Sequence, residues 1–458
     1  MDKEHIIMRF VDLFAGTGGI RLGFEQACFE HGLKSECVFS SEIDKKACES
    51  YELNFGVNPQ SDICQVSTLP EFDFLLAGFP CQAFSYAGKQ KGFGDTRGTL
   101  FFEVERLLSK HMPSFFLLEN VRGLTTHDQG RTFKTIQDHL KKLGYHLHYL
   151  LLNSSNFGVP QNRVRIYILG SRYGEIGSDL YSDTGPADSH KYRKEWKQGD
   201  LFEVSKKQTV VADILDRVVD TKYHCSNEFT RQLRNIIGED LTALHGFRLI
   251  DYRGGQSIHS WELGIKGKCS AKETEFMNLL IANRRKKNFG THQDGKALTI
   301  EQIRTFYNKD DLLDILSSLH AKGYVSCYDG KYNPVAGNMS FEVFKFLDPN
   351  SISITLTASD TNRLGVVHDG IARRLTPREC ARLQGYPDTY KLLADDCAVY
   401  KQMGNGVSVP VIKAVISDFI SKNKDQIQKA QQGGGLNGYP PHASCGAGAA
   451  PRVAVSHL

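Results

Sequence analysis

The sequence lacks the features that mark several classes of protein. No stretch approaches the ~18 consecutive apolar residues of a membrane-spanning helix. The charged start at Met1–His5 is not followed by the apolar segment of a secretory signal. None of the 11 cysteines forms a CxxC pair, so neither a disulfide scaffold nor a metal site is expected. We therefore expect a cytosolic protein with reduced thiols and no membrane partner.

The sequence also has little net charge. Lys and Arg number 56 against 52 Asp and Glu, which gives +4 over 458 residues. Hydrophobic residues at 40% and charged residues at 24% are ordinary for globular proteins and exclude a wholly disordered or fibrous chain. At ~150 residues per domain, the length predicts two or three domains. The charge is uneven, because residues 266–309 hold ten basic and four acidic side chains.

Residues 1–171 alternate apolar runs with helix-like stretches. The runs lie at 9–14, 37–40, 72–77, 114–118 and 165–169. Continuous apolar strands separated by helices predict a doubly wound, mostly parallel α/β sheet. The regular pattern returns over 371–425, so this domain is expected to be discontinuous.

Residues 172–370 are polar and irregular, and we expect them to form a large inserted domain. Between about 270 and 333, two helix-like stretches precede a hairpin with an Asp-Gly turn. This order favours a winged-helix-like unit, although a helical insertion with a basic solvent face explains it as well. Residues 426–458 end in a segment rich in glycine, proline and alanine, and they are predicted to be a disordered or appended tail.

A glycine-rich turn, 15–19, follows the first predicted strand. Glycines there let the backbone approach a ligand closely. Glu42 ends the second predicted strand, where an acid can accept hydrogen bonds from a ribose diol, and Asp62 is expected near an adenine. The spacing departs from the dinucleotide fingerprint and no Walker lysine is present. The pattern therefore favours an adenosyl ligand without a pyrophosphate, such as S-adenosylmethionine.

Reactive side chains follow the next predicted strands. Cys81 comes after Pro80 at the carboxyl end of a strand, where a partly exposed thiolate would be reactive. A buried cysteine in a tight turn is the competing interpretation. Glu119 ends the following strand and could act as an acid beside a nucleophile. Arg163 and Arg165 alternate in an extended segment, so both are expected to point toward the ligand crevice while the residue between them packs inward.

In their order, these segments resemble the motifs of bacterial DNA (cytosine-5)-methyltransferases, the HhaI-type modification methylases. The resemblance covers about residues 8–171 and 371–421, and 172–370 would be the variable target-recognition domain. It implies the S-adenosylmethionine-dependent methyltransferase fold. The segments are Asp12–Gly19, Glu42, Pro80–Gln82, Glu119–Val121, Gln161–Arg165, Arg374–Pro387 and Gln402–Asn405.

The resemblance also implies a role for each motif residue. The Cys81 thiolate would add to C6 of a cytosine flipped out of the duplex, and Glu119 would hold or protonate N3. Arg163 and Arg165 would orient the base. Cofactor contacts are expected from Phe14, Ala15, Gly16, Gly18, Gly19, Glu42, Ile43, Asp62, Pro80 and Asn405. DNA contacts are expected from Gln82, Ser85, Lys89, Arg97, Arg284, Arg285, Lys286 and Lys287.

The leading hypothesis is a monomeric, cytoplasmic bacterial enzyme that methylates double-stranded DNA and serves as the modification partner of a restriction endonuclease. An RNA cytosine-5 methyltransferase on the same scaffold is the first alternative, which the long recognition region disfavours. The second is a DNA-binding regulator with an inactive catalytic core. The complete set of Cys81, Glu119, Arg163 and Arg165 argues against it.

Overall fold

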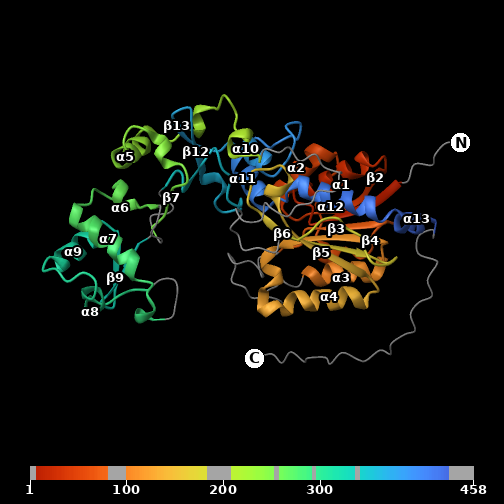
Figure 1. Ribbon diagram of the computed structural model, residues 1–458, viewed down its shortest axis with the longest axis horizontal. Helices are drawn as coiled ribbons and strands as arrows, with labels where there is room; N and C mark the ends of the chain where they lie inside the picture. The colour runs from red at the N-terminus through yellow and green to blue at the C-terminus, as the bar shows by residue number, and fades with distance from the viewer. Residues whose placement is uncertain are drawn as a thin grey trace.

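The computed structural model describes residues 7–80, 100–182, 208–251, 257–290, 296–335 and 341–432. These residues form two parts, one built on a large sheet with helices on both faces and one made of smaller elements (Figure 1). We call them the catalytic part and the recognition part, after the roles that the sequence leads us to expect. The catalytic part lies on the right in Figure 1 and the recognition part on the left. Both ends of the described chain belong to the catalytic part, and the recognition part is inserted between them.

The large sheet has the strand order β2-β1-β3-β4-β6-β5. Strands β2, β1, β3 and β4 are parallel, and β6 runs antiparallel to both β4 and β5. The predicted mostly parallel α/β sheet is therefore confirmed. Each of the four residues of β3 is buried, as expected for a central strand covered on both faces. The strands are β1 (Ile7–Leu13), β2 (Lys34–Ser41), β3 (Phe74–Ala77), β4 (Phe115–Val121), β5 (His146–Asn153) and β6 (Val164–Ser171).

Helices from both ends of the chain cover one face of this sheet. Helix α1 (Gly19–Glu30) lies beside α12 (Val409–Lys422), and an added Cβ at Gly23 would come within 2.8 Å of the Val409 carbonyl oxygen. This close approach explains the glycine. Helices α3 (Leu100–His111) and α4 (Arg131–Lys142) cover the other face (Figure 1). Helix α2 (Lys45–Phe55) follows β2.

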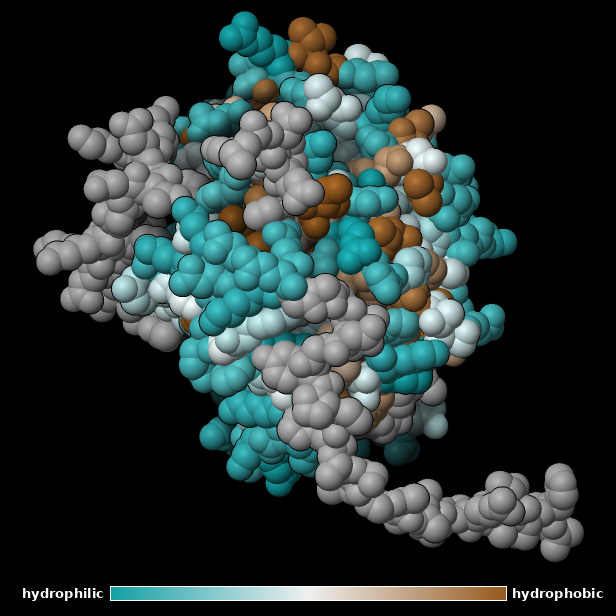
Figure 2. Space-filling view, turned by 90° about the vertical axis from the view of Figure 1, so that its right-hand side faces the viewer, coloured by the Kyte–Doolittle hydropathy of each residue, from teal (hydrophilic) through white to brown (hydrophobic). Residues whose placement is uncertain are grey.

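The most apolar helical stretch belongs to the core of the catalytic part. It spans Asp396–Lys422, and 67% of its most apolar window is buried. Val411, Ile412 and Val415 of this stretch pack in the same core as strand β1. Figure 2 shows that the surface at this end of the molecule is mostly hydrophilic, with apolar side chains scattered over it. The apolar composition of the stretch is therefore explained by packing.

The catalytic part extends past two of the expected boundaries. After residue 171, Ile176 and Leu180 still pack against its core. Helix α13 (Lys424–Gln432) continues beyond residue 425, where the tail was expected to begin, because Ile427 and Ala430 are buried in the same core. Residues 433–458 lie outside the described residues.

The recognition part contains a second sheet with the order β13-β12-β11-β7-β8. Strand β13 lies within 371–425, which was expected to return wholly to the catalytic domain. Strand β13 belongs to the recognition part, because it pairs antiparallel with residues Gly365 to His368 of β12. The elements are α5 (Asn227–Ile237), β7 (Arg248–Leu249), β8 (Ser257–Ile258), α6 (Ser260–Leu263), β11 (Lys345–Leu347), β12 (Leu364–His368) and β13 (Ile371–Arg374).

A separate helical unit with its own core lies farther out in the recognition part (Figure 1). Its final hairpin turns at Asp329 and Gly330, whose φ angles are 50° and 67°. Two positive φ values identify the predicted Asp-Gly hairpin turn. The unit has helices followed by a hairpin, which is the order of elements in a winged helix. The winged-helix assignment stays a prediction. The elements are α7 (Ala271–Asn283), α8 (Ile300–Arg304), α9 (Leu312–Ala321), β9 (Val325–Tyr328) and β10 (Lys331–Pro334).

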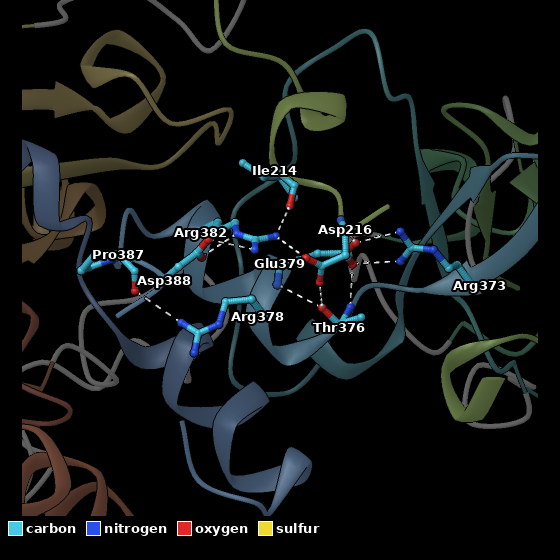
Figure 3. A network of polar contacts seen from close by, with 9 residues as sticks. All are labelled: Ile214, Asp216, Arg373, Thr376, Arg378, Glu379, Arg382, Pro387 and Asp388. Carbon is cyan, nitrogen blue, oxygen red and sulfur yellow. Dashed lines mark hydrogen bonds and ion pairs between the residues drawn. The ribbon is translucent and has the colours of Figure 1, made fainter. Parts of the chain in front are cut away.

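A buried ion pair joins the two parts of the molecule (Figure 3). Arg373, on β13, donates two hydrogen bonds of 2.9 and 2.7 Å to the carboxylate of Glu379, on α10 (Pro377–Leu383). The side chains are only 3% and 0% exposed. Glu379 also accepts hydrogen bonds from the backbone N–H groups of Thr376 and Asp216. These contacts hold strand β13 of the second sheet against helix α10.

We expect Glu379→Gln to destabilise the protein by about 3–5 kcal/mol, because the Arg373 guanidinium would remain buried without its counter-charge. The change should appear as a lower urea concentration at the unfolding midpoint. Glu228→Gln is the control, since its partner Arg231 is 69% exposed and exposed pairs contribute little. Equal midpoints for the two variants would contradict this account of the joint.

Candidate active site

The predicted catalytic and cofactor residues that the structure describes lie around one edge of the large sheet. The parallel strands β1, β2, β3 and β4 all end at this edge, where ligands bind in open α/β sheets. Strand β6 is antiparallel to β4, so its first residues lie at the same edge. Arg165 is paired with Val121, two residues after Glu119. The antiparallel strand therefore brings Arg165 and Glu119 together.

Glu119 is a buried acid beside the strand that leads to Cys81. Its Oε1 lies 3.3 Å from Nε of Arg165. Burial raises the pKa of the Glu119 carboxyl, and the nearby guanidiniums of Arg165 and Arg163 partly oppose that shift. The Oε2 atom faces the end of β3, because a Cβ added at Gly78 would lie 3.9 Å from it. A carboxyl in this setting keeps its proton to higher pH than an exposed one.

Asn120 fixes the end of β3 relative to β4. Its side-chain amide donates a hydrogen bond of 3.2 Å to the carbonyl of Phe79, the residue before Pro80. Pro80 is half-buried at the end of the described segment. This contact depends on a side chain in the Glu119–Val121 motif to which no role was assigned from sequence.

Arg163 differs from the expectation that both arginines point into the crevice. It is 3% exposed and donates hydrogen bonds to the carbonyls of Leu356 and Gly406. Among the described residues, Arg165 is the ion-pair partner of Glu119, and Val164 is half-buried rather than part of the core. Arg163 is covered by the chain segment that contains Ser353 and Leu356. This segment lies against Arg163 because Ser353 forms a parallel bridge with Gln161. Arg163 thus positions backbone segments around the site.

Gln161 connects its own segment, just before β6, to two segments that are distant in the sequence. Its side chain is fully buried. Its amide NH₂ donates to the carbonyl of Leu383 at 2.8 Å, and its Oε1 accepts from the N–H of Leu356 at 3.0 Å. The recognition region and the returning catalytic chain are thereby aligned at the start of β6.

The cofactor residues at the ends of β1 and β2 are brought together. The Glu42 carboxylate accepts hydrogen bonds of 2.8 Å from the N–H groups of Gly16, Ile43 and Asp44. Phe14 has a φ of 54°, a strained conformation that is concentrated at functional sites. Gly16 and Gly18 also have positive φ, 55° and 77°. The turn is therefore fixed by Glu42.

The remaining candidate cofactor residues differ in how exposed they are. Asp62 is exposed and follows Ser61, whose N–H donates to the carbonyl of Glu42 at 3.0 Å. Ile43 is 70% exposed. Asn405 is exposed at the end of α11 (Asp396–Asn405). Ala15 and Gly19 are buried within the turn and its helix.

Two tyrosines from the returning chain hold the glycine-rich turn, and sequence analysis did not find them. The hydroxyl of Tyr386 lies 2.7 Å from Oγ1 of Thr17, and the hydroxyl of Tyr390 donates to the Thr17 carbonyl at 2.7 Å. A Cβ at Gly19 would lie 2.5 Å from the Tyr386 hydroxyl. Gly19 therefore serves close packing as well as ligand approach.

For S-adenosylmethionine, the cofactor that the sequence resemblance implies, we expect Tyr386→Phe to raise the KM about 2- to 10-fold, the effect of losing one hydrogen bond, with little change in kcat. Tyr400→Phe is the control, because its hydroxyl bonds the carbonyl of Leu375 and not the turn. Initial-rate measurements at saturating DNA separate the two. Equal KM values in both variants would show that Tyr386 does not position the turn.

The side chains predicted to contact DNA differ in their exposure to solvent. Arg284 is 2% exposed at the end of α7, so the prediction that this side chain contacts DNA is corrected. Arg285 is half-buried, and Lys286 and Lys287 are exposed. Cys81, Gln82, Ser85, Lys89 and Arg97 lie outside the described residues.

Comparison with known proteins identifies the family. The profile of the C-5 cytosine-specific DNA methylases matches residues 8–421. The chain belongs to this family. The methylase is 63% identical over 420 residues to the type II methyltransferase M.BanI of Aneurinibacillus aneurinilyticus, covering 92% of this chain and 97% of the relative. It is 60% identical to M.HgiCI of Herpetosiphon aurantiacus, covering 90% and 98%.

A solved structure supports the fold of the methylase. The Dnmt2 methyltransferase of S. pombe aligns with a TM-score of 0.50 and 16% identity, covering 90% of this chain and 98% of that one. At this identity the likeness concerns the fold alone. This likeness confirms the expected methyltransferase fold. Family membership and the type II relatives confirm the expected enzyme class, a DNA (cytosine-5)-methyltransferase.

Proposed function

We propose that the methylase transfers a methyl group from S-adenosylmethionine to C5 of a cytosine flipped out of duplex DNA, through a covalent bond between Cys81 and C6. The observation that carries this proposal is the buried Glu119 carboxyl, paired with Arg165 and facing the end of the strand that precedes Cys81. The modification partner of a restriction endonuclease is the biological role that the type II relatives support.

The Glu119 site suits the first step of this chemistry. A cytosine ring accepts a thiolate at C6 only when electron density is withdrawn through N3. A protonated carboxyl can donate its hydrogen to N3, and burial of Glu119 favours that protonated form. Arg165 holds the carboxyl in place. Once Cys81 has bonded to C6, C5 becomes nucleophilic, and later loss of its proton with release of Cys81 restores the ring.

The residues around the glycine-rich turn fit an adenosyl cofactor. Gly16 and Gly18 leave backbone without side chains next to the Glu42 carboxylate, which can accept hydrogen bonds from ribose hydroxyls. When bound, S-adenosylmethionine supplies an electrophilic methyl group. Phe14 would stack on the adenine and Asp62 would accept from its amine. Ala15, Gly19, Ile43, Pro80 and Asn405 would line the rest of the site.

The target cytosine must leave the duplex to reach Glu119, which is buried at the sheet edge. Flipping a base costs a few kcal/mol, so we expect the protein to stabilise the extruded base and the strand beside it. The exposed Lys286 and Lys287 and the candidates Gln82, Ser85, Lys89 and Arg97 would contribute DNA contacts, with phosphate contacts positioning rather than specifying the sequence.

Methyl transfer from labelled cofactor to a random duplex library, followed by bisulfite sequencing, tests the proposal. We expect methylation of a cytosine in one short recurring sequence. A matched library of single-stranded RNA should take up no label. Failure to label any duplex, or labelling of RNA alone, would overturn the proposed function.

A further inference from the structure

A small cavity in the recognition part has an arginine in its wall. Arg248, on β7, lines a cavity of about 160 Å³. Among the residues that the structure describes, none forms an ion pair with the Arg248 guanidinium. The one acid of the cavity wall, Asp360, is instead paired with Arg363 at 3.0 Å. The other wall residues are Phe344, Ile354, Thr355, Thr357, Thr361 and Leu364.

A second cation lies next to Arg248. Lys345, on β11, is the Cα partner of Arg248 across the two strands. Its ammonium donates to the carbonyl of Gly246 and, within the described chain, to no carboxylate. Burial and then the charge of Arg248 lower the pKa of Lys345 to about 8. Two adjacent cations without a counter-charge repel one another, so an anion between them would stabilise this part of the sheet.

The cavity adjoins the candidate active site. Thr355 and Thr357 of its wall flank Leu356, whose carbonyl accepts a hydrogen bond from Arg163 at 3.0 Å. The Thr355 hydroxyl donates to the carbonyl of Asn162. Arg165, the partner of Glu119, follows three residues later in the same extended segment. An anion in this cavity would therefore lie close to the base that Glu119 contacts.

We propose that Arg248 and Lys345 bind a backbone phosphate of the DNA strand beside the target cytosine. This inference rests on the proposed function and adds a phosphate site to it. A phosphate carries a full negative charge and accepts hydrogen bonds in several directions, which suits a guanidinium and an ammonium together. A base edge offers only partial charges and would leave two adjacent cations uncompensated. The site positions the strand and is not expected to read sequence.

The test measures DNA affinity of Arg248→Ala and Lys345→Ala across a salt series. Each lost phosphate contact should reduce the slope of log affinity against log salt by ~0.9. Affinity should fall by the same factor for the sequence that the enzyme methylates and for an unrelated duplex. Lys429→Ala is the control, because it removes one exposed positive charge from α13 on the catalytic part.

A second measurement compares wild type with Arg248→Ala on DNA in which single phosphates are neutralised. Duplexes with one neutral methylphosphonate at successive positions near the target cytosine should include a position that weakens binding of wild type but not of Arg248→Ala. Unchanged salt slopes, or no such position, would overturn the phosphate site. If Arg248→Ala loses more affinity for the sequence that the enzyme methylates than for the unrelated duplex, Arg248 would be assigned to base recognition instead. Wild type that methylates no duplex would overturn the proposed function itself, which separates the two failures.

Discussion

Replacing Cys81 with alanine is expected to reduce methyl transfer on the order of 10⁶-fold, comparable to the loss of a covalent nucleophile in well-studied hydrolases. Without a thiolate, no bond forms at C6 and C5 remains unreactive. Cofactor affinity and duplex binding should change little, because the Glu42 carboxylate and the recognition part are untouched. The measurement is the single-turnover rate with labelled cofactor and a duplex containing the target sequence.

A substrate with 5-fluorocytosine makes the same prediction visible as a covalent complex. Fluorine at C5 cannot be removed as a proton, so the bond between Cys81 and C6 persists after methyl transfer. Wild type should give a denaturation-resistant protein–DNA complex, and Cys81→Ser should give none. Cys397→Ala is the matched control, since Cys397 is exposed at the start of α11. A trapped complex with Cys81→Ser would contradict the assignment of the nucleophile.

The sequence predicts every strand of the large sheet except β5, which lies at one edge. Strands β1, β3 and β4 are nearly continuous apolar runs, because helices cover both faces. Strand β5 was not predicted, since it mixes His146 and His148 with leucines and its burial is uneven. In the recognition part, β7, β8 and β11 have only two or three residues. Strands that short leave no measurable alternation.

Site residues are predictable where local chemistry marks them. Glycines and acids at strand ends indicate the cofactor turn, and Glu42 and Gly16 are indeed in contact. The Tyr386–Thr17 contact joins residues 369 positions apart, so no local pattern contains it. Alternation in an extended segment gives Arg163 and Arg165 the same expected direction. Which of them meets Glu119 depends on a segment almost 200 residues away, whose Leu356 carbonyl binds Arg163.

Glu119→Gln is expected to lower kcat by about 10²- to 10⁴-fold, the usual contribution of a general acid. The amide has nearly the same shape and can still contact a base, but it cannot give a proton to N3. Burial raises the pKa of Glu119, so the wild-type carboxyl stays protonated above the ordinary carboxyl range. Wild-type activity should therefore fall as pH passes the raised pKa of Glu119.

The pH profile distinguishes a proton donor from a residue that only fills space. In Glu119→Gln, the fall in activity that is due to ionisation of Glu119 should disappear. The variant should be less stable than wild type, because Arg165 loses its ion-pair partner, so the rates are compared at temperatures at which both proteins are folded. Glu36→Gln, at an exposed position of β2, should keep the complete wild-type profile. A lowered rate with the fall at high pH intact in Glu119→Gln would mean that Glu119 orients the base without donating its proton.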